Sequence, residues 1–210
     1  MSFVYMKILE SRPERYDVGM GLLTLGTLTK IKQQIADHTH PGNQVLDLGC
    51  GTGTLAKMCI ERGAHVTGVD ANSGMLAVAK RNSPTANYLN ISLSNLDDHL
   101  EDESFDIILS TLAFSELTRA ERVHVMKQIK RILKNDGKVL IGDEIIPENF
   151  LAKCFYYAFR LPMRLLTWIM TQTTTNAIPN FDEEVREAGM KIINSKSYML
   201  GMFILLEIKK

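Results

Sequence analysis

Short apolar runs alternate with helical patterns along the middle of the chain. Five runs rich in Val, Ile and Leu, each bounded by Gly, Asp, Asn or Ser, have the length of buried strands. These runs are Gln44–Leu48, His65–Asp70, Tyr88–Leu93, Phe105–Ser110 and Gly137–Asp143. The helical segments between them are Thr52–Arg62, Ser73–Arg81 and Arg119–Leu133. This alternation predicts a parallel sheet with helices on both faces.

The third helical segment is amphipathic. One stripe along it consists of Val123, Met126, Ile129 and Leu133, with most charged residues elsewhere. We interpret those charges as a solvated helix face and not as a nucleic-acid surface. The triplet Asn135-Asp136-Gly137 is predicted to end this helix and to begin the next strand.

The last thirty residues follow a different pattern. Asp182–Ala188 is predicted to be helical and to end at Gly189. The runs Ile192–Tyr198 and Phe203–Ile208 are joined by a connection too short for a crossover. Two strands joined so tightly must be antiparallel, so the sheet is predicted to gain an antiparallel pair at one edge.

Composition narrows the class of protein. The chain has 210 residues, 45% of them hydrophobic, with 24 basic and 24 acidic side chains and no net charge. This length and this share of hydrophobic residues fit a single globular domain. Because basic residues do not outnumber acidic ones, a nucleic-acid partner is not expected. The charged N-terminal stretch and the lack of a long apolar run predict neither a secretion signal nor a membrane span. We therefore expect a cytoplasmic protein.

The three cysteines, Cys50, Cys59 and Cys154, are too scattered for a disulfide framework or a zinc site. His38 and His40 lack partners at ligand spacing, so no metal site is expected.

The segment from Asp47 to Gly53 carries the clearest chemical signal. A buried strand ends near an acid, and Gly49, Gly51 and Gly53 follow at alternate positions before a helix. Glycines allow a sharp turn and a close approach by a ligand at the carboxyl end of a strand. A dinucleotide fingerprint would need glycine at Thr54, and Asp47 would repel a pyrophosphate but suit an amino group.

Asp70 ends the next strand, 17 residues after Gly53, which leaves room for one helix and one returning strand. A carboxylate at that strand end can accept both hydroxyls of a ribose.

Four segments in order resemble the Rossmann-like S-adenosylmethionine-dependent methyltransferases. They are Asp47–Gly53, Gly68–Asp70 with Asn72–Leu76, Ser104–Ser110, and Arg131–Gly137. The resemblance implies a doubly wound α/β fold with a seven-stranded, mostly parallel sheet and an antiparallel edge strand. It also implies S-adenosyl-L-methionine as the cofactor.

The resemblance further implies the cofactor contacts. Asp47 and the loop would hold the methionine end, Asp70 the ribose, and Ala71 or Asn72 the adenine. Where the family often has an Asp-Ala pair, this chain has Ser92-Leu93. Ser92 can be interpreted equally well as an adenine contact or as an ordinary serine at the end of a strand. The full set of expected contacts is Asp47, Gly49, Cys50, Gly51, Gly53, Asp70, Ala71, Asn72, Met75, Ser92, Leu93 and Ser110.

A narrower resemblance lies near the N-terminus. Tyr16-Asp17 and Leu23–Gly26, followed by the glycine loop, are similar in order and spacing to the ubiquinone/menaquinone biosynthesis C-methyltransferases. In that family the N-terminal segment covers the substrate pocket. The resemblance therefore implies a small lipophilic acceptor. A soluble metabolite, a cofactor-binding protein without catalysis and a nucleotide-dependent reductase are the alternatives.

A base is needed only if the methyl acceptor carries a proton. Tyr16, Glu116 and Asp143 are the candidates. Each has a plain structural alternative: Tyr16 as a packed ring, Glu116 as a solvated turn acid, and Asp143 as a cap on the next turn.

We divide the single methyltransferase domain, 1–210, into a helical cover (1–40), a cofactor-binding core (41–145), a hydrophobic helical insert (146–180) and a final helix with two strands (181–210). Within the insert, 150–170 combines apolar side chains with Lys153, Arg160 and Arg164, and Pro162 is expected to break it into two helices. Three interpretations stay open: a lid with its own core, a lid for an apolar substrate, or an amphipathic helix on the inner membrane surface.

Overall fold

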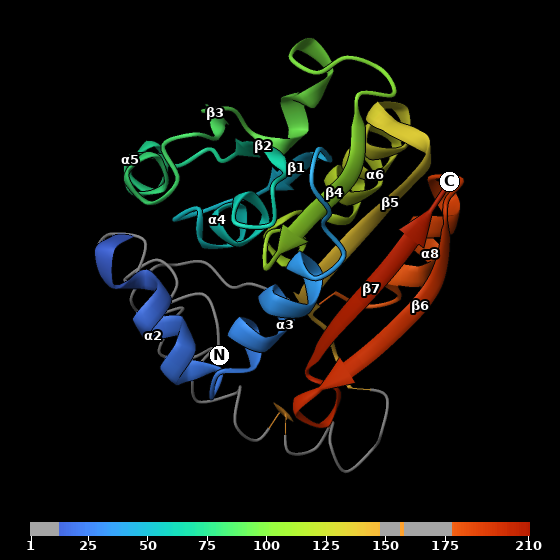
Figure 1. Cartoon of the computed structure of the whole chain (residues 1–210). Helices are drawn as coiled ribbons and strands as arrows, with labels where there is room; N and C mark the ends of the chain where they lie inside the picture. The colour runs from blue at the N-terminus through green and yellow to red at the C-terminus, as the bar shows by residue number, and fades with distance from the viewer. Residues whose placement is uncertain (1–12, 148–155, 158–177) are drawn as a thin grey trace.

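The computed structural model describes residues 13–147, 156–157 and 178–210. One seven-stranded sheet runs through them in the order β3-β2-β1-β4-β5-β7-β6 (Figure 1). Its strands are β1 (Gln44–Leu48), β2 (His65–Val69), β3 (Asn87–Leu89), β4 (Phe105–Thr111), β5 (Leu133–Glu144), β6 (Lys191–Tyr198) and β7 (Phe203–Lys209). The expected α/β fold with a mostly parallel sheet is confirmed.

The antiparallel pair at the edge is also confirmed, and its order is now defined. Strands β1 to β5 pair in parallel, whereas β7 runs antiparallel to both β5 and β6. The antiparallel strand therefore lies one place in from the edge, and β6 forms the edge itself.

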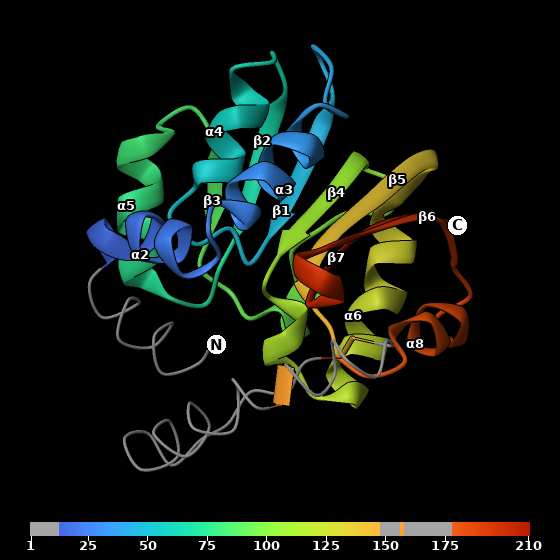
Figure 2. The same cartoon turned by 90° about the horizontal axis from the view of Figure 1, so that it is seen from below.

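Helices cover both faces of the sheet. On one face, α3 (Thr27–Ala36) and α4 (Thr54–Ile60) pack against β1, β4 and β5. On the other face lie α6 (Arg119–Ile132) and α8 (Phe181–Glu187), as the two perpendicular views show (Figures 1 and 2). Helix α5 (Ser73–Asn82) follows β2 and packs beside α4. The doubly wound arrangement follows directly from the strand–helix alternation.

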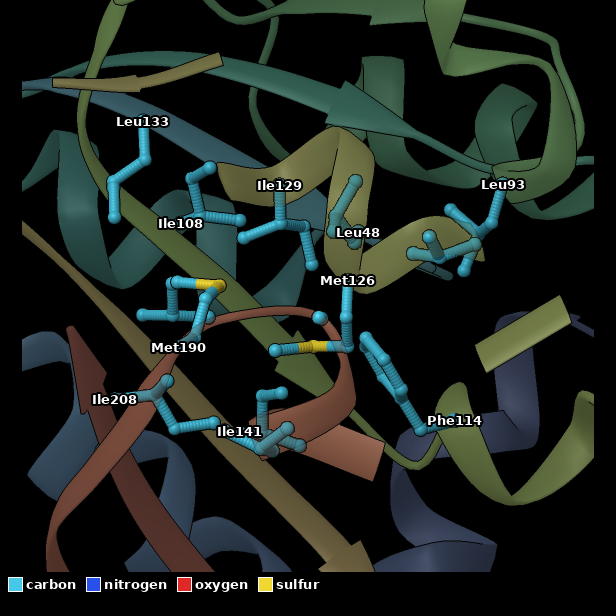
Figure 3. Packing of buried hydrophobic residues seen from close by; sticks show 14 of the residues in the cluster. Leu48, Leu93, Ile108, Phe114, Met126, Ile129, Leu133, Ile141, Met190 and Ile208 are labelled. Carbon is cyan, nitrogen blue, oxygen red and sulfur yellow. The ribbon is translucent and has the colours of Figure 1, made fainter. Parts of the chain in front are cut away.

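The larger core forms under α6. Met126 and Ile129 of the predicted stripe are fully buried, and they face Ile108 of β4 and Ile141 of β5 across an apolar interface (Figure 3). A fully buried side chain of this size stabilises the fold by roughly 1.5–3 kcal/mol. The hydrophobic periodicity therefore identified the helix face correctly.

The boundary between α6 and β5 was predicted wrongly. The helix ends at Ile132, and β5 begins at once with Leu133, which pairs with Phe105. Asn135-Asp136-Gly137 lies inside the strand, where the register between β4 and β5 shifts. Buried Leu133 belongs to the core in either conformation, so burial alone could not place the boundary.

Two further boundaries differ from the prediction. The strand expected over Tyr88–Leu93 is shorter: β3 ends at Leu89, the last residue that pairs with β2, and Leu93 already belongs to the 3-10 helix η2 (Leu93–Asp98). Helix α4 begins at Thr54 and not at Thr52, because Gly53 adopts a left-handed conformation with φ of 74°.

The part of the N-terminal segment that the structure describes is helical, as expected for the helical cover. It contains η1 (Pro13–Arg15), α2 (Tyr16–Leu23) and α3. Both views place α2 close to α4 and α5, at the end of the sheet where the parallel strands finish (Figures 1 and 2). Residues 1–12 and most of the 146–180 insert, including the 150–170 stretch with Lys153, Arg160 and Arg164, lie outside the described residues.

Candidate active site

The acids singled out in the sequence meet at the carboxyl ends of adjacent strands. Asp47 of β1 is paired with Gly68 of β2, and Asp70 directly follows β2. On the other side of β1, Leu48 pairs with Ser110 of β4. The strand register therefore brings Asp47, Asp70 and Ser110 to one edge of the sheet.

The glycine loop turns at this edge through left-handed backbone conformations. Gly49 has φ of 67°, and a Cβ there would lie 2.5 Å from the Cβ of Ala113. Gly51 has φ of 54°, but a Cβ there would have no atom within 4 Å. Glycine is needed at the first position for close packing and at both positions for backbone conformation. The open space at Gly51 is where a ligand can approach the main chain.

Asp70 is tied to this loop. Its carboxylate accepts hydrogen bonds from the backbone N–H of Gly51 at 2.9 Å and of Asn72 at 2.8 Å. Burial raises the pKa of Asp70, and these two hydrogen bonds oppose that rise. A carboxylate offers about four acceptor positions, so two remain for a ligand that brings hydroxyl groups.

Asp47 is the most unusual group of the site. It is 1% exposed, and neither carboxyl oxygen accepts a hydrogen bond of ordinary geometry from the described residues. Burial raises the pKa of Asp47 to about 7, with the negative charge of Asp70 adding to the rise and Lys32 opposing it. A buried polar group without a partner next to an open loop is typical of a binding site.

Several other expected contacts have their side chains engaged within the protein. Asn72 caps α5 by accepting from the N–H of Gly74 at 2.9 Å and of Met75 at 3.2 Å. Ser110 donates to the carbonyl oxygen of Leu48 at 2.9 Å, which locks β4 to β1. Ser92 accepts from the N–H of Ser94 at the start of η2.

The remaining expected contacts differ in exposure. Met75 is a buried residue of α5, and Leu93 is buried in the core beneath α6, whereas Ala71 is exposed beside Asp70. Cys50 is buried in the loop, and burial raises the pKa of its thiol, so it stays uncharged. Gly53 is packed against Ala79 of α5 and Tyr88. Ala71 therefore has the most accessible side chain among these positions.

The three candidate bases have different surroundings. Asp143 is buried at the end of β5, and its carboxylate accepts from the backbone N–H groups of Phe114, Ser115 and Glu144. Burial raises the pKa of Asp143 to about 6 despite these hydrogen bonds. Glu116 is exposed in η3 (Phe114–Glu116), and Tyr16 packs against the small apolar cluster of Met20, Leu28 and Leu112. Asp143 thus holds η3 in place, which is a structural role, although η3 precedes β5 in the chain and is not the next turn that the capping alternative named.

Sequence reasoning missed four residues that contact the site. Asp17 of α2 accepts hydrogen bonds from Thr52 and Thr54 and is paired with Lys32 of α3. These contacts join residues 15 to 37 positions apart, so no local pattern reveals them. The only available signal was the Tyr16-Asp17 motif, which the sequence analysis linked to a family but not to the loop.

Comparison with known proteins identifies the family. Residues 46–141 match the methyltransferase domain family. The chain is 30% identical over 171 residues to a demethylmenaquinone methyltransferase of Thermotoga maritima, covering 78% of this chain and 70% of the relative. It is 26% identical to a ubiquinone/menaquinone biosynthesis C-methyltransferase of Campylobacter jejuni, covering 80% of this chain and 78% of the relative.

The fold is also found among solved structures. A TehB-like SAM-dependent methyltransferase from Corynebacterium glutamicum aligns with a TM-score of 0.63 at 21% identity, covering 86% of this chain and 87% of that structure. At this level of identity the likeness shows a shared fold.

Proposed function

Since the chain belongs to the Rossmann-like S-adenosylmethionine-dependent methyltransferases, we propose that it methylates a small, lipophilic acceptor of the quinone type. The observation that carries this proposal is the similarity to a demethylmenaquinone methyltransferase, which extends over 78% of the chain and so well beyond the matched domain at 46–141. The apolar composition of the 146–180 insert supports an acceptor of low polarity.

The described residues fit the cofactor. Its ammonium group is a suitable partner for the buried, unpartnered carboxyl of Asp47. Its ribose hydroxyls suit the remaining acceptor positions of Asp70. The open space at Gly51 allows the methionine end to approach the backbone. We propose these three positions as the main cofactor contacts.

In a methyl transfer of this kind, the main task of the protein is to align the acceptor with the methyl group. Bound S-adenosylmethionine supplies a methyl group that is already activated by a positively charged sulfur. Holding an acceptor in line with such a group can contribute roughly 7–11 kcal/mol to lowering the barrier. Where the acceptor carries a proton, we propose Tyr16 or Glu116 to receive it, since the Asp143 carboxylate is bound to three backbone N–H groups.

We also propose a peripheral contact between residues 150–170 and a membrane that holds the acceptor. Three cations and no acid stand among the apolar side chains of this stretch, which suits an anionic lipid surface. None of the helices within the described ranges is long and apolar enough to cross a bilayer.

Calorimetry with S-adenosylhomocysteine tests cofactor binding. The wild type should bind, and Asp70→Ala should bind at least about tenfold more weakly, because a hydrogen bond to a carboxylate is worth roughly 1.5–3 kcal/mol. Asp136→Ala is the matched control, since Asp136 is exposed near the start of β5, away from the site.

Transfer of a labelled methyl group then tests the acceptor. Incorporation into demethylated quinones supports the proposal, whereas incorporation only into soluble metabolites would identify the polar alternative. Cofactor binding without transfer to any tested compound would contradict catalysis on either class.

A further inference from the structure

A carboxylate of helix α2, that of Asp17, is hydrogen-bonded to the glycine loop. The Oδ2 atom of Asp17 accepts a hydrogen bond from Thr52 Oγ1 at 2.6 Å and another from Thr54 Oγ1 at 2.8 Å. Thr52 is 2% exposed, and its carbonyl oxygen accepts from the Asn82 side chain. Asp17 therefore contacts both residues that flank Gly53, at the point where the loop becomes α4.

The other oxygen of Asp17 faces a buried cation. Lys32 Nζ lies 3.5 Å from Asp17 Oδ1, and the lysine is 9% exposed on α3. The charge of Lys32 also acts on Asp47 of β1. A buried ammonium is costly unless acids surround it. Lys32 thus interacts both with Asp17, which is hydrogen-bonded to the loop, and with the buried Asp47.

An ion pair just before α2 differs from the contacts of Asp17. Glu14 of η1 pairs with Arg81 of α5 at 3.1 Å, and both side chains are more than half exposed. This ion pair fixes the segment to the surface of the molecule but touches neither the loop nor an acid of the site. An exposed pair of this kind contributes little free energy.

We propose that Asp17 and Lys32 are positioning residues for the cofactor, which hold the glycine loop in its binding shape when α2 is in place. The inference rests on the proposed cofactor contacts and adds two residues outside the matched domain at 46–141. It also links the cover to the cofactor site, because the carboxylate that shapes the loop is carried by the cover. Cofactor binding should therefore stabilise the cover.

Calorimetry with S-adenosylhomocysteine on the full chain is the first test. Asp17→Asn keeps the shape and an acceptor oxygen but removes the charge between the threonines and Lys32. We expect about tenfold weaker binding, in keeping with the loss of charge-assisted hydrogen bonds. Glu14→Gln, the matched control, should bind like the wild type.

Hydrogen exchange gives a readout that simple loss of stability would not produce. In the wild type, S-adenosylhomocysteine should slow exchange of the amides in 16–23, and this slowing should be smaller in Asp17→Asn. Equal protection in both proteins would contradict the proposed link.

The Thr54 variants keep the test decisive if Asp17→Asn does not fold. Thr54→Val removes one donor and should weaken binding, while Thr54→Ser retains the hydroxyl and should restore the affinity to within about twofold. Wild-type affinity in Asp17→Asn, or in Thr54→Val, would overturn this inference alone. Absence of binding by the wild type would overturn the cofactor contacts on which it rests.

Discussion

Asp47 shows at the scale of a single residue how the fold prepares a site. A buried polar group without a hydrogen bond costs about 1–3 kcal/mol of stability. Asp47 is such a group, and the only nearby cation that opposes its raised pKa is the Lys32 ammonium, among the residues the structure describes. A ligand that brings a positive charge to this carboxyl would remove the cost. The group that destabilises the protein without ligand would thus favour binding of a cationic group, as the proposed cofactor contact requires.

The pH dependence of cofactor binding follows from this group. With its pKa at about 7, Asp47 is mainly neutral at pH 6 and mainly ionised at pH 8. If the ionised form pairs with the ammonium of the cofactor, affinity for S-adenosylhomocysteine should rise about tenfold between these pH values. Calorimetry across this range measures the rise. In Asp47→Asn the profile should be flatter, and an equally steep profile there would rule Asp47 out.

The raised pKa of Asp47 affects the stability of the protein without ligand in the opposite direction from its effect on binding. Because the pKa of Asp47 is higher in the folded state than in the unfolded chain, folding takes up a proton between about pH 4 and pH 7. The stabilising contribution is complete below pH 4 and is lost as the pH rises through 7. Binding and stability should therefore change in opposite directions with pH.

At the scale of whole elements, two ion pairs join the same two helices and differ in burial. Arg122 of α6 makes a two-pronged contact with Glu184 of α8, at 2.6 and 2.7 Å, and both side chains are almost fully buried. Arg119 and Glu187 join these helices again at 2.7 Å, but about half of each side chain is exposed. Burial, and not the number of ion pairs, should decide how firmly α8 is held.

Urea unfolding of two matched variants tests this difference. Glu184→Gln leaves the Arg122 charge buried without its partner and should cost about 3–5 kcal/mol in the free energy of unfolding. Glu187→Gln should cost at most about 1 kcal/mol. Equal losses for the two variants would mean that burial of the first pair has no energetic consequence.

The elements also show what the sequence could and could not predict. Strand–helix alternation identified the sheet, and the apolar stripe identified the buried face of α6, because both signals repeat within a few residues. Leu133 was placed in the wrong element, since burial gives the same preference for apolar residues in a helix and in a strand. The contact between Asp17 and Thr54 depends on how α2 meets α4, which no local pattern encodes.

At the scale of the whole molecule, the proposed lipophilic acceptor requires a surface through which the protein could reach it. Three of the most exposed large apolar side chains are Val18, Leu22 and Leu25, at 69%, 73% and 83%. The first two share one face of α2 and the third follows its end, near the carboxyl end of the parallel strands (Figure 2). Exposed apolar surface beside a binding site suits contact with a lipid surface.

Sedimentation with anionic liposomes tests this contact. The wild type should associate partially, and the double variant Arg160→Glu and Arg164→Glu should associate less, because each basic residue near the surface contributes about 1 kcal/mol. Leu22→Ser should also reduce association. Ile193→Ser is the control, since Ile193 is exposed on the edge strand β6. Sedimentation that is unchanged in the charge-reversal variant would remove the membrane contact.

A crystal structure of the protein grown with S-adenosylhomocysteine is the most direct test of the central claim. The amino group of the ligand should lie at Asp47, its ribose hydroxyls at Asp70, and its methionine end along the backbone at Gly51. A ligand bound elsewhere, with both carboxyl groups lacking any contact to it, would contradict these cofactor contacts.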